Sequence, residues 1–177
     1  MSVPGNDPVA DPTGYRTLVL SFLGDDDPAD VQAETPGVLR SLAADAGDLL
    51  RAPPAEGEWS VLQLIGHILH AELVSGFRYR AIVAEDEPRL APYDQDIWIE
   101  RLPPGDADLE EQLRLFDALR AANLSMWARS TEAERARVGQ HEERGPESFE
   151  LSFRLIAGHD RLHVDQARRT LGALRER

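Results

Sequence analysis

Apolar residues recur along most of this chain at intervals of three and four, which is the spacing of amphipathic helices. The clearest stretch begins at Trp59-Ser60 and runs toward Val83. Its broad apolar stripe consists of Val61, Leu62, Ile65, Ile68, Leu69 and Leu73. Ser60 can cap the first turn, so we expect a helix to start there. No segment alternates apolar and polar residues as a strand would, which favours an all-α fold.

Three more long stretches share the helical spacing. The first opens at Thr35-Pro36, a capping residue followed by a proline at the first helical position, and ends before Pro53-Pro54. The others span about residues 107–129 and 148–174, and a shorter helix is expected from Tyr15 to Leu23. Residues 85–108 carry four prolines and predict a long crossover loop with one helical turn around residues 97–99. Four long helices with one long crossover indicate a four-helix bundle.

The length of 177 residues fits a single domain. Residues 1–13 are rich in Pro, Gly and Asp and lack periodicity, which predicts a flexible N-terminal leader or, alternatively, a strap over the bundle. Residues 14–177 are therefore expected to form one helical domain.

Charge and residue usage exclude several classes of partner. The net charge of -13, with 32 acidic against 19 basic residues, repels phosphate backbones and anionic lipid surfaces. No apolar run approaches the ~20 residues of a membrane span, and no signal peptide is visible. We therefore expect a cytoplasmic protein that binds neither nucleic acid nor membranes. Because the chain has no cysteine, any metal must be held by histidines and carboxylates.

Three histidines are the candidate metal ligands. His159 and His163 are four residues apart, so one face of a helix presents both imidazoles to a single ion. His67 lies in a different predicted helix and could complete a three-histidine set, which leaves one coordination position open. However, His67 lies off the strongest apolar stripe of its helix. The spacing alone is equally consistent with histidines that make ordinary hydrogen bonds at the edge of the core.

Two segments resemble the signatures of a known family. WSVLQLIGHILHAE at 59–72, followed by an arginine at 78 or 80, and GHDRLHVDQ at 158–166 resemble motifs of the DinB/YfiT-like superfamily. The resemblance extends over about residues 35–172. It implies a four-helix bundle of up-down-down-up order that binds a divalent metal, often nickel or zinc, through three histidines. These positions fall on His67, His159 and His163.

One position departs from the family pattern. His70 stands where the family commonly has an aspartate, which leaves open a fourth metal ligand and a closed, structural site. A role for His70 at the surface or beside the ligands is the favoured interpretation.

The resemblance also implies an activity. Family members include thiol S-transferases, so we expect a metal-dependent transferase that joins a low-molecular-weight thiol to an electrophilic small molecule. A metal-dependent hydrolase and a non-catalytic metal-binding stress protein are the alternatives, and a homodimer is a family-level expectation. The sequence identifies no catalytic residue.

Several other side chains carry structural expectations. Glu72 lies on an apolar stripe and is expected to pair with an arginine. Asp160 and Asp165 are candidates to orient a ligand histidine in a hydrolase. His141 lies among charged residues and is interpreted as a solvated loop residue. The tryptophans are assigned to core packing: Trp59, Trp98 and Trp127.

Overall fold

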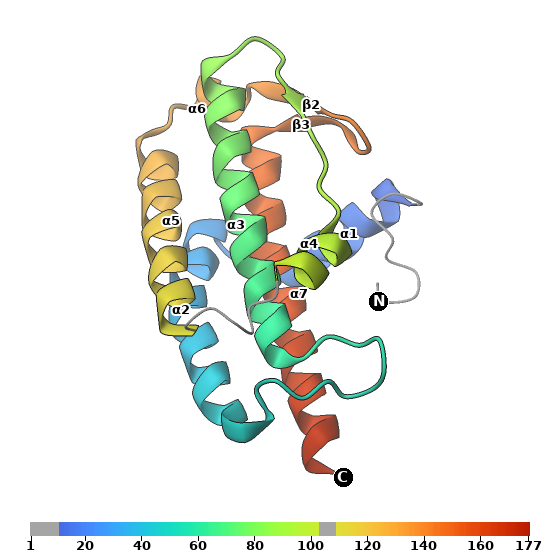
Figure 1. The fold of residues 1–177 in the computed structure, drawn as a ribbon. Coiled ribbons are helices and arrows are strands. Elements are labelled where there is room, and N and C mark those ends of the chain that lie inside the picture. Colours follow the sequence, from blue (N-terminus) through green and yellow to red (C-terminus); the bar gives the residue numbers. More distant parts are fainter. Residues whose placement is uncertain (1–10, 103–108) are drawn as a thin grey trace.

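The computed structural model describes residues 11–102 and 109–177, and four long helices dominate it (Figure 1). They are α2 (Pro28–Ala46), α3 (Val61–Ala84), α5 (Leu109–Arg129) and α7 (Phe149–Arg175). Figure 1 shows that α2 and α7 run in one direction, whereas α3 and α5 run in the other. The predicted four-helix bundle of up-down-down-up order is therefore confirmed.

Shorter elements connect and cover the bundle. They are α1 (Pro12–Leu23), a 3-10 turn (Gly47–Leu49), β1 (Arg89–Leu90), α4 (Gln95–Arg101), α6 (Glu132–Arg135), β2 (Val138–His141) and β3 (Gly145–Ser148). Helix α1 starts three residues earlier than the sequence predicted. Most of the predicted leader, residues 1–10, lies outside the described residues.

The long helices pack in a ring in which α3 lies against both α5 and α7, and α2 also contacts both of these helices. Residues on α3 and α7 can therefore meet in one site. In the described part of the chain, no helix is both long and apolar enough to span a bilayer.

The predicted boundaries of α3 and α7 are confirmed, since each helix starts at a serine cap. The Ser60 side chain accepts the N–H of Gln63, whose own side chain accepts the N–H of Ser60. The Ser148 hydroxyl accepts the N–H of Leu151. These caps satisfy N–H groups that have no partner within the helix.

The predicted start of the first bundle helix at Thr35-Pro36 is wrong. Helix α2 begins at Pro28, where Asp27 caps the helix, and Pro36 lies inside it. A proline has no N–H to donate, so the carbonyl of Gln32 loses its helical partner. That carbonyl instead accepts Nη1 of Arg120 at 3.0 Å. A tertiary contact thus replaces the helical hydrogen bond.

The expectation that no segment forms a strand also needs correction. β1, which falls within the predicted crossover loop, pairs in parallel with β2, and β2 pairs antiparallel with β3 across a tight turn. Gly145 adopts a φ of 74° at this turn, a conformation that favours glycine. The small sheet closes one end of the bundle (Figure 1).

A buried ionic cluster joins all four long helices. Arg120 of α5 pairs with Glu72 of α3 at 2.9 Å and with Asp160 of α7 at 2.7 Å. Through its bond to Gln32 it also reaches α2. Asn123 donates to Glu72 at 2.8 Å. The arginine partner expected for Glu72 is therefore Arg120, and we call this set the central ionic cluster.

Helix α1 packs closely on α7 at Gly158, where an added Cβ would lie 2.1 Å from the carbonyl oxygen of Val19. Because that atom belongs to the backbone, α1 would have to move. We expect Gly158→Ala to lower the free energy of unfolding by about 1–3 kcal/mol, the range for overpacking. Urea denaturation measures this change.

Gly172→Ala is the matched control on the same helix. Gly172 is exposed, and an added Cβ there meets no atom within 4 Å. Alanine should raise the stability by up to about 1 kcal/mol, because glycine is the poorer helix former. Equal effects of the two substitutions would contradict the close α1–α7 contact.

Candidate metal centre

The structure brings the three predicted histidines together from two neighbouring helices. His67 lies on α3, and His159 and His163 lie one turn apart on α7. His67 and His159 are buried, with 1% and 7% of their surfaces exposed, and His163 is partly buried. One ring nitrogen from each lies within 4.8 Å of the other two.

Two of the ligand nitrogens lie close together, and the third ring lies beside them. Nε2 of His67 and Nε2 of His159 are 2.9 Å apart, and the ring centres of His159 and His163 are 4.3 Å apart. Two imidazole nitrogens on one tetrahedral zinc, each about 2.0–2.1 Å from the metal, lie about 3.3 Å apart. The spacing of His67 and His159 is close to this value, so the residues fit a metal ion.

The environment keeps these imidazoles neutral. Burial lowers the pKa of His67 and of His159 well below the usual value, and the neighbouring histidines lower both further. Burial also lowers the pKa of His163 to about 4. Neutral imidazole is the form that coordinates a metal, so binding near pH 7 would displace no proton from these rings.

Gln166 orients His163. Its Oε1 lies 3.0 Å from Nδ1 of His163, and because an amide oxygen only accepts, Nδ1 carries the proton. Nε2 of His163 then keeps its lone pair for a metal. Nδ1 of His67 and of His159 is buried with no hydrogen-bond partner among the described residues.

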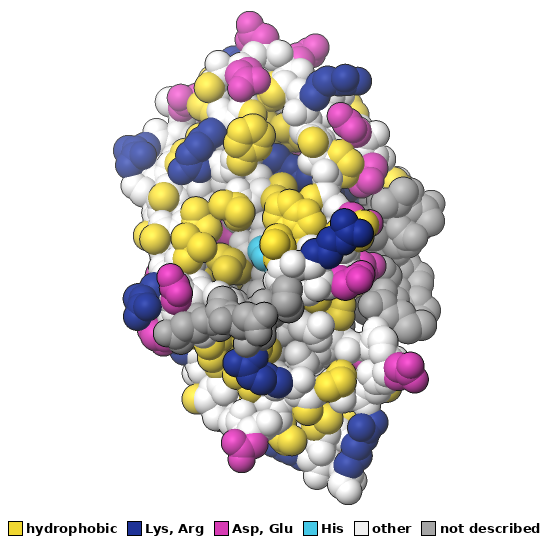
Figure 2. All heavy atoms as spheres, viewed as in Figure 1, with side chains coloured by type: hydrophobic (Ala, Val, Ile, Leu, Met, Phe, Trp, Pro, Cys, Tyr) yellow, Lys and Arg dark blue, Asp and Glu magenta, His cyan; other side chains and the backbone are white. Residues whose placement is uncertain are grey.

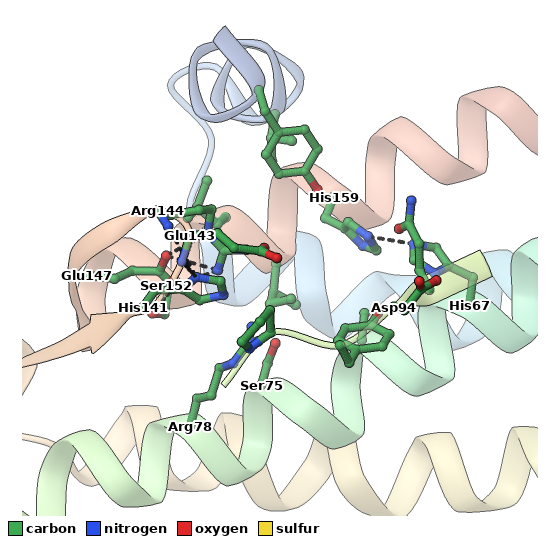
Figure 3. Close-up of a pocket in the computed structure, with 18 of the residues that line it drawn as sticks. His67, Ser75, Arg78, Asp94, His141, Glu143, Arg144, Glu147, Ser152 and His159 are labelled. Atoms are coloured by element: carbon green, nitrogen blue, oxygen red, sulfur yellow. Dashed lines mark hydrogen bonds and ion pairs between the residues drawn. The ribbon is translucent and has the colours of Figure 1, made fainter. Parts of the chain in front are cut away.

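A pocket of about 440 Å³ opens beside the histidines. His67 and His159 line one end of it, whereas His141 and Arg144 lie at the other (Figure 3). Glu147 forms an ion pair with Arg144, and it also accepts a hydrogen bond from the hydroxyl of Ser152. An ion at the histidines would therefore face a cavity large enough for a small molecule.

The other candidate residues have different roles. His70 lies outside the three-histidine cluster, and its ring packs edge-on against Trp98. Asp160 accepts from Arg120 and Thr35, so its contacts are with the central ionic cluster. Asp165 pairs with Arg169 at the surface. The expectation that either aspartate orients a ligand histidine therefore finds no support in these contacts.

The interpretation of His141 as a solvated loop residue is wrong. His141 lies on β2 and is only 2% exposed. Its strand buries alternate residues, but with four residues it is too short to show a clear periodicity in the sequence. The pairing with β1 and β3 encloses it.

Two of the three tryptophans pack in the core as predicted. Trp127 stacks on Phe153 with ring centres 4.1 Å apart, and Trp59 packs against the main core and the ring of His67. Trp98 instead packs between His70 and Tyr93 beside the pocket.

Basic and acidic side chains are interspersed on the face of the molecule in Figure 2, and hydrophobic side chains gather near its middle around a visible histidine. This face therefore presents no continuous basic surface.

Comparisons with known proteins agree with this architecture. The chain is 26% identical over 128 residues to a Bacillus mycoides (strain KBAB4) protein that is provisionally named a metal-dependent hydrolase, covering 72% of this chain and 71% of the relative. A Geobacillus thermodenitrificans (strain NG80-2) protein of the same provisional name is 26% identical over 135 residues, covering 75% and 76% of the two chains.

The structure of YfiT from Bacillus subtilis, described as an unusual four-helix bundle, matches with a TM-score of 0.73 at 23% identity. The match covers 83% of this chain and 87% of YfiT, and it supports the fold. The model of the DinB superfamily matches residues 29–167, which include α3 and α5, nearly all of α2, α7 as far as residue 167, and all three histidines. This chain belongs to the DinB superfamily.

Proposed function

We propose that this protein is a metal-dependent hydrolase that holds one zinc or nickel ion with His67, His159 and His163. The observation that carries the proposal is the grouping of these three imidazoles, two of which, His67 and His159, line one end of a pocket. The provisional names of the relatives also support hydrolysis.

The three histidines suit this chemistry because they leave one coordination position open. A divalent metal in such a site polarises a carbonyl and lowers the pKa of a water molecule that it holds to about 7. The contribution of the chain is to keep the imidazoles neutral, to fix the ring of His163 through Gln166 and to confine the substrate in the pocket.

Metal loading followed by a hydrolysis assay tests the proposal. After chelation and reloading, mass spectrometry should find about one zinc or nickel ion per chain, as a single three-histidine site requires. The loaded protein should then hydrolyse small esters or amides faster than the chelated protein. Failure to take up either ion would refute the metal site, whereas tight binding without hydrolysis would favour a non-catalytic metal-binding protein.

Gln166→Met should weaken metal binding about 10- to 100-fold, the usual cost of losing a group that orients a ligand. Methionine keeps the length of the side chain but cannot accept the Nδ1 proton of His163 in the same way. Competition with a chromogenic chelator measures the affinity. Asp165→Asn is the control, because Asp165 is half-exposed and pairs with Arg169 at the surface. Equal losses in both variants would contradict the orienting role.

Transfer of a low-molecular-weight thiol to an electrophile stays a prediction, and the names of the relatives do not support it. The same open coordination position could hold a thiolate, so the hydrolysis assay should be repeated with added thiol and an electrophile. Thiol consumption without hydrolysis would favour the transferase. The expected homodimer also stays a prediction.

A further inference from the structure

Arg78 is a buried cation that pairs with no carboxylate among the described residues. It lies on α3, is 7% exposed and lines the pocket. Its Nη2 donates to the carbonyl of Ala91 at 2.6 Å, but its Nε has no acceptor among the described residues. A buried guanidinium normally has an anionic partner, because removal of a charge from water costs several kcal/mol.

His141 offers a second unused donor in the same pocket. Its Nδ1 lies 3.2 Å and 3.3 Å from the backbone nitrogens of Glu143 and Arg144, which donate to it. Nδ1 is therefore the acceptor, and the proton of the neutral ring must lie on Nε2. Nε2 is buried and has no partner within the described ranges.

The carboxylates around the pocket leave both donors available. Glu147 is occupied by Arg144 and Ser152, and Asp94 accepts the N–H of Ile97 at the start of α4. Glu143 and Asp96 are exposed. In the described residues none of Glu147, Asp94 and Glu143 forms an ion pair with Arg78 or accepts from Nε2 of His141.

The two donors lie at the end of the pocket opposite the candidate metal ligands (Figure 3). His67, Ala71, Ser75 and Arg78 follow one another along one face of α3 and all line the pocket. The α carbons of His67 and Arg78 are thus about 16 Å apart along the axis, at about 1.5 Å per residue.

Apolar side chains also line the pocket: Val19, Ala71, Leu155 and Ile156. Ala71 lies between His67 and Arg78 on α3, and Leu155 and Ile156 lie between Ser152 and His159 on α7. The pocket thus combines a histidine cluster, an apolar middle and two buried donors. A molecule that filled it would place an acceptor group against the donors and a different group near the histidines.

We propose that Arg78 and Nε2 of His141 bind the carboxylate of a small, partly apolar substrate. This inference rests on the proposed function for what happens at the histidine end: the substrate would be a carboxylic acid whose hydrolysable bond lies several atoms from its carboxylate. The binding of the carboxylate itself requires no metal.

A matched pair of ligands tests the carboxylate site. Hexanoate and hexanamide have nearly the same shape, but only hexanoate carries a charge. Calorimetry should show that hexanoate binds about 10- to 100-fold more tightly than hexanamide, the range expected for hydrogen bonds to a charged group. The measurement is made on the protein as purified and repeated after chelation, so that failure of the metal site leaves this result interpretable.

Three variants locate the site. In Arg78→Met the ratio of the affinity for hexanoate to the affinity for hexanamide should fall close to one. His141→Phe should reduce this ratio several-fold. Arg129→Met is the control, because Arg129 is exposed on α5, donates to Ser125 and does not line the pocket. The melting temperature of Arg78→Met should be unchanged or raised, since this change removes an uncompensated buried charge.

Three outcomes would overturn the proposal. They are equal binding of hexanoate and hexanamide, absence of binding by both ligands, and a preference that survives Arg78→Met. Competition distinguishes the kind of anion, because acetate should displace hexanoate at lower concentration than inorganic phosphate does. The reverse order would overturn the carboxylate assignment and identify a phosphoryl group.

Discussion

Replacement of His67, His159 or His163 by alanine should lower the affinity for zinc or nickel by more than about 100-fold. Loss of a group that merely orients a ligand already costs about 10- to 100-fold, and each substitution here removes a ligand itself. Among the described residues, no further histidine or carboxylate belongs to this group, so no other side chain is in place to substitute for a lost ligand. Mass spectrometry of metal content after dialysis against a chelator measures the loss.

His70→Ala is the control for this series. His70 lies one turn from His67 on α3 but packs against Trp98. Its removal should leave the metal content unchanged. A loss as large as in the other three variants would show that His70 is a fourth ligand and would exclude an open site. Unchanged binding in His163→Ala would instead reduce the proposed set to two histidines.

The sequence predicted the helices that carry strong local signals. Helix α3 has its serine cap and a broad apolar stripe, and α7 has a cap at Ser148 and a long periodic stretch. Such signals depend on neighbouring residues alone, so they can be recognised without the tertiary structure. The predicted start of α2 was wrong because two pairs in the sequence have the pattern of a helix start. Thr35-Pro36 has this pattern, but Asp27-Pro28 is the pair that begins the helix.

The small sheet could not be predicted for a different reason. Its strands contain two to four residues, and β1 is separated from β2 by nearly fifty positions. Pairing over that distance depends on the bundle that holds both segments in place. The burial of His141 follows from this pairing. The end of the pocket that His141 lines could therefore not be predicted from the sequence.

In the candidate metal centre, too, local spacing predicted some residues, whereas the position of another depended on the tertiary structure. The pair on α7 follows directly from the spacing of His159 and His163. Periodicity did not assign His67, because α3 is enclosed on several sides and buries residues around most of its circumference. A histidine off the main apolar stripe is therefore still buried. For this residue the family resemblance supplied what the helical spacing left open.

Arg120→Met should lower the free energy of unfolding by about 3–5 kcal/mol, the usual cost when one partner of a buried ion pair is lost. Burial alone would lower the pKa of Arg120, but Asp160 and Glu72 together raise it, so the side chain stays charged. Without it, two buried carboxylates lose their counter-charge and the carbonyl of Gln32 loses its donor. Urea denaturation at pH 7 measures the change.

A matched control separates burial from ion pairing. Arg40 also joins two helices, since it pairs with Asp117 across α2 and α5, but both side chains are more than a third exposed. Arg40→Met should therefore cost no more than about 1 kcal/mol. Equal losses in the two variants would contradict a special role for the central ionic cluster. If Arg120→Met does not fold, Arg120→Lys retains the charge and provides a measurable intermediate.

The pH dependence gives the cluster a signature that simple loss of packing lacks. Burial raises the pKa of Glu72, and Arg120 opposes this rise. Removal of Arg120 should raise the pKa of Glu72 further, so the folded variant takes up a proton more readily than the unfolded chain. A group whose pKa is raised in the folded state stabilises at low pH and loses that contribution as the pH increases. The stability lost in Arg120→Met should therefore be smaller at pH 5 than at pH 8. Addition of Glu72→Gln to Arg120→Met should restore part of the lost stability and reduce its pH dependence. A loss that is independent of pH would mean that Arg120 acts through its packing alone.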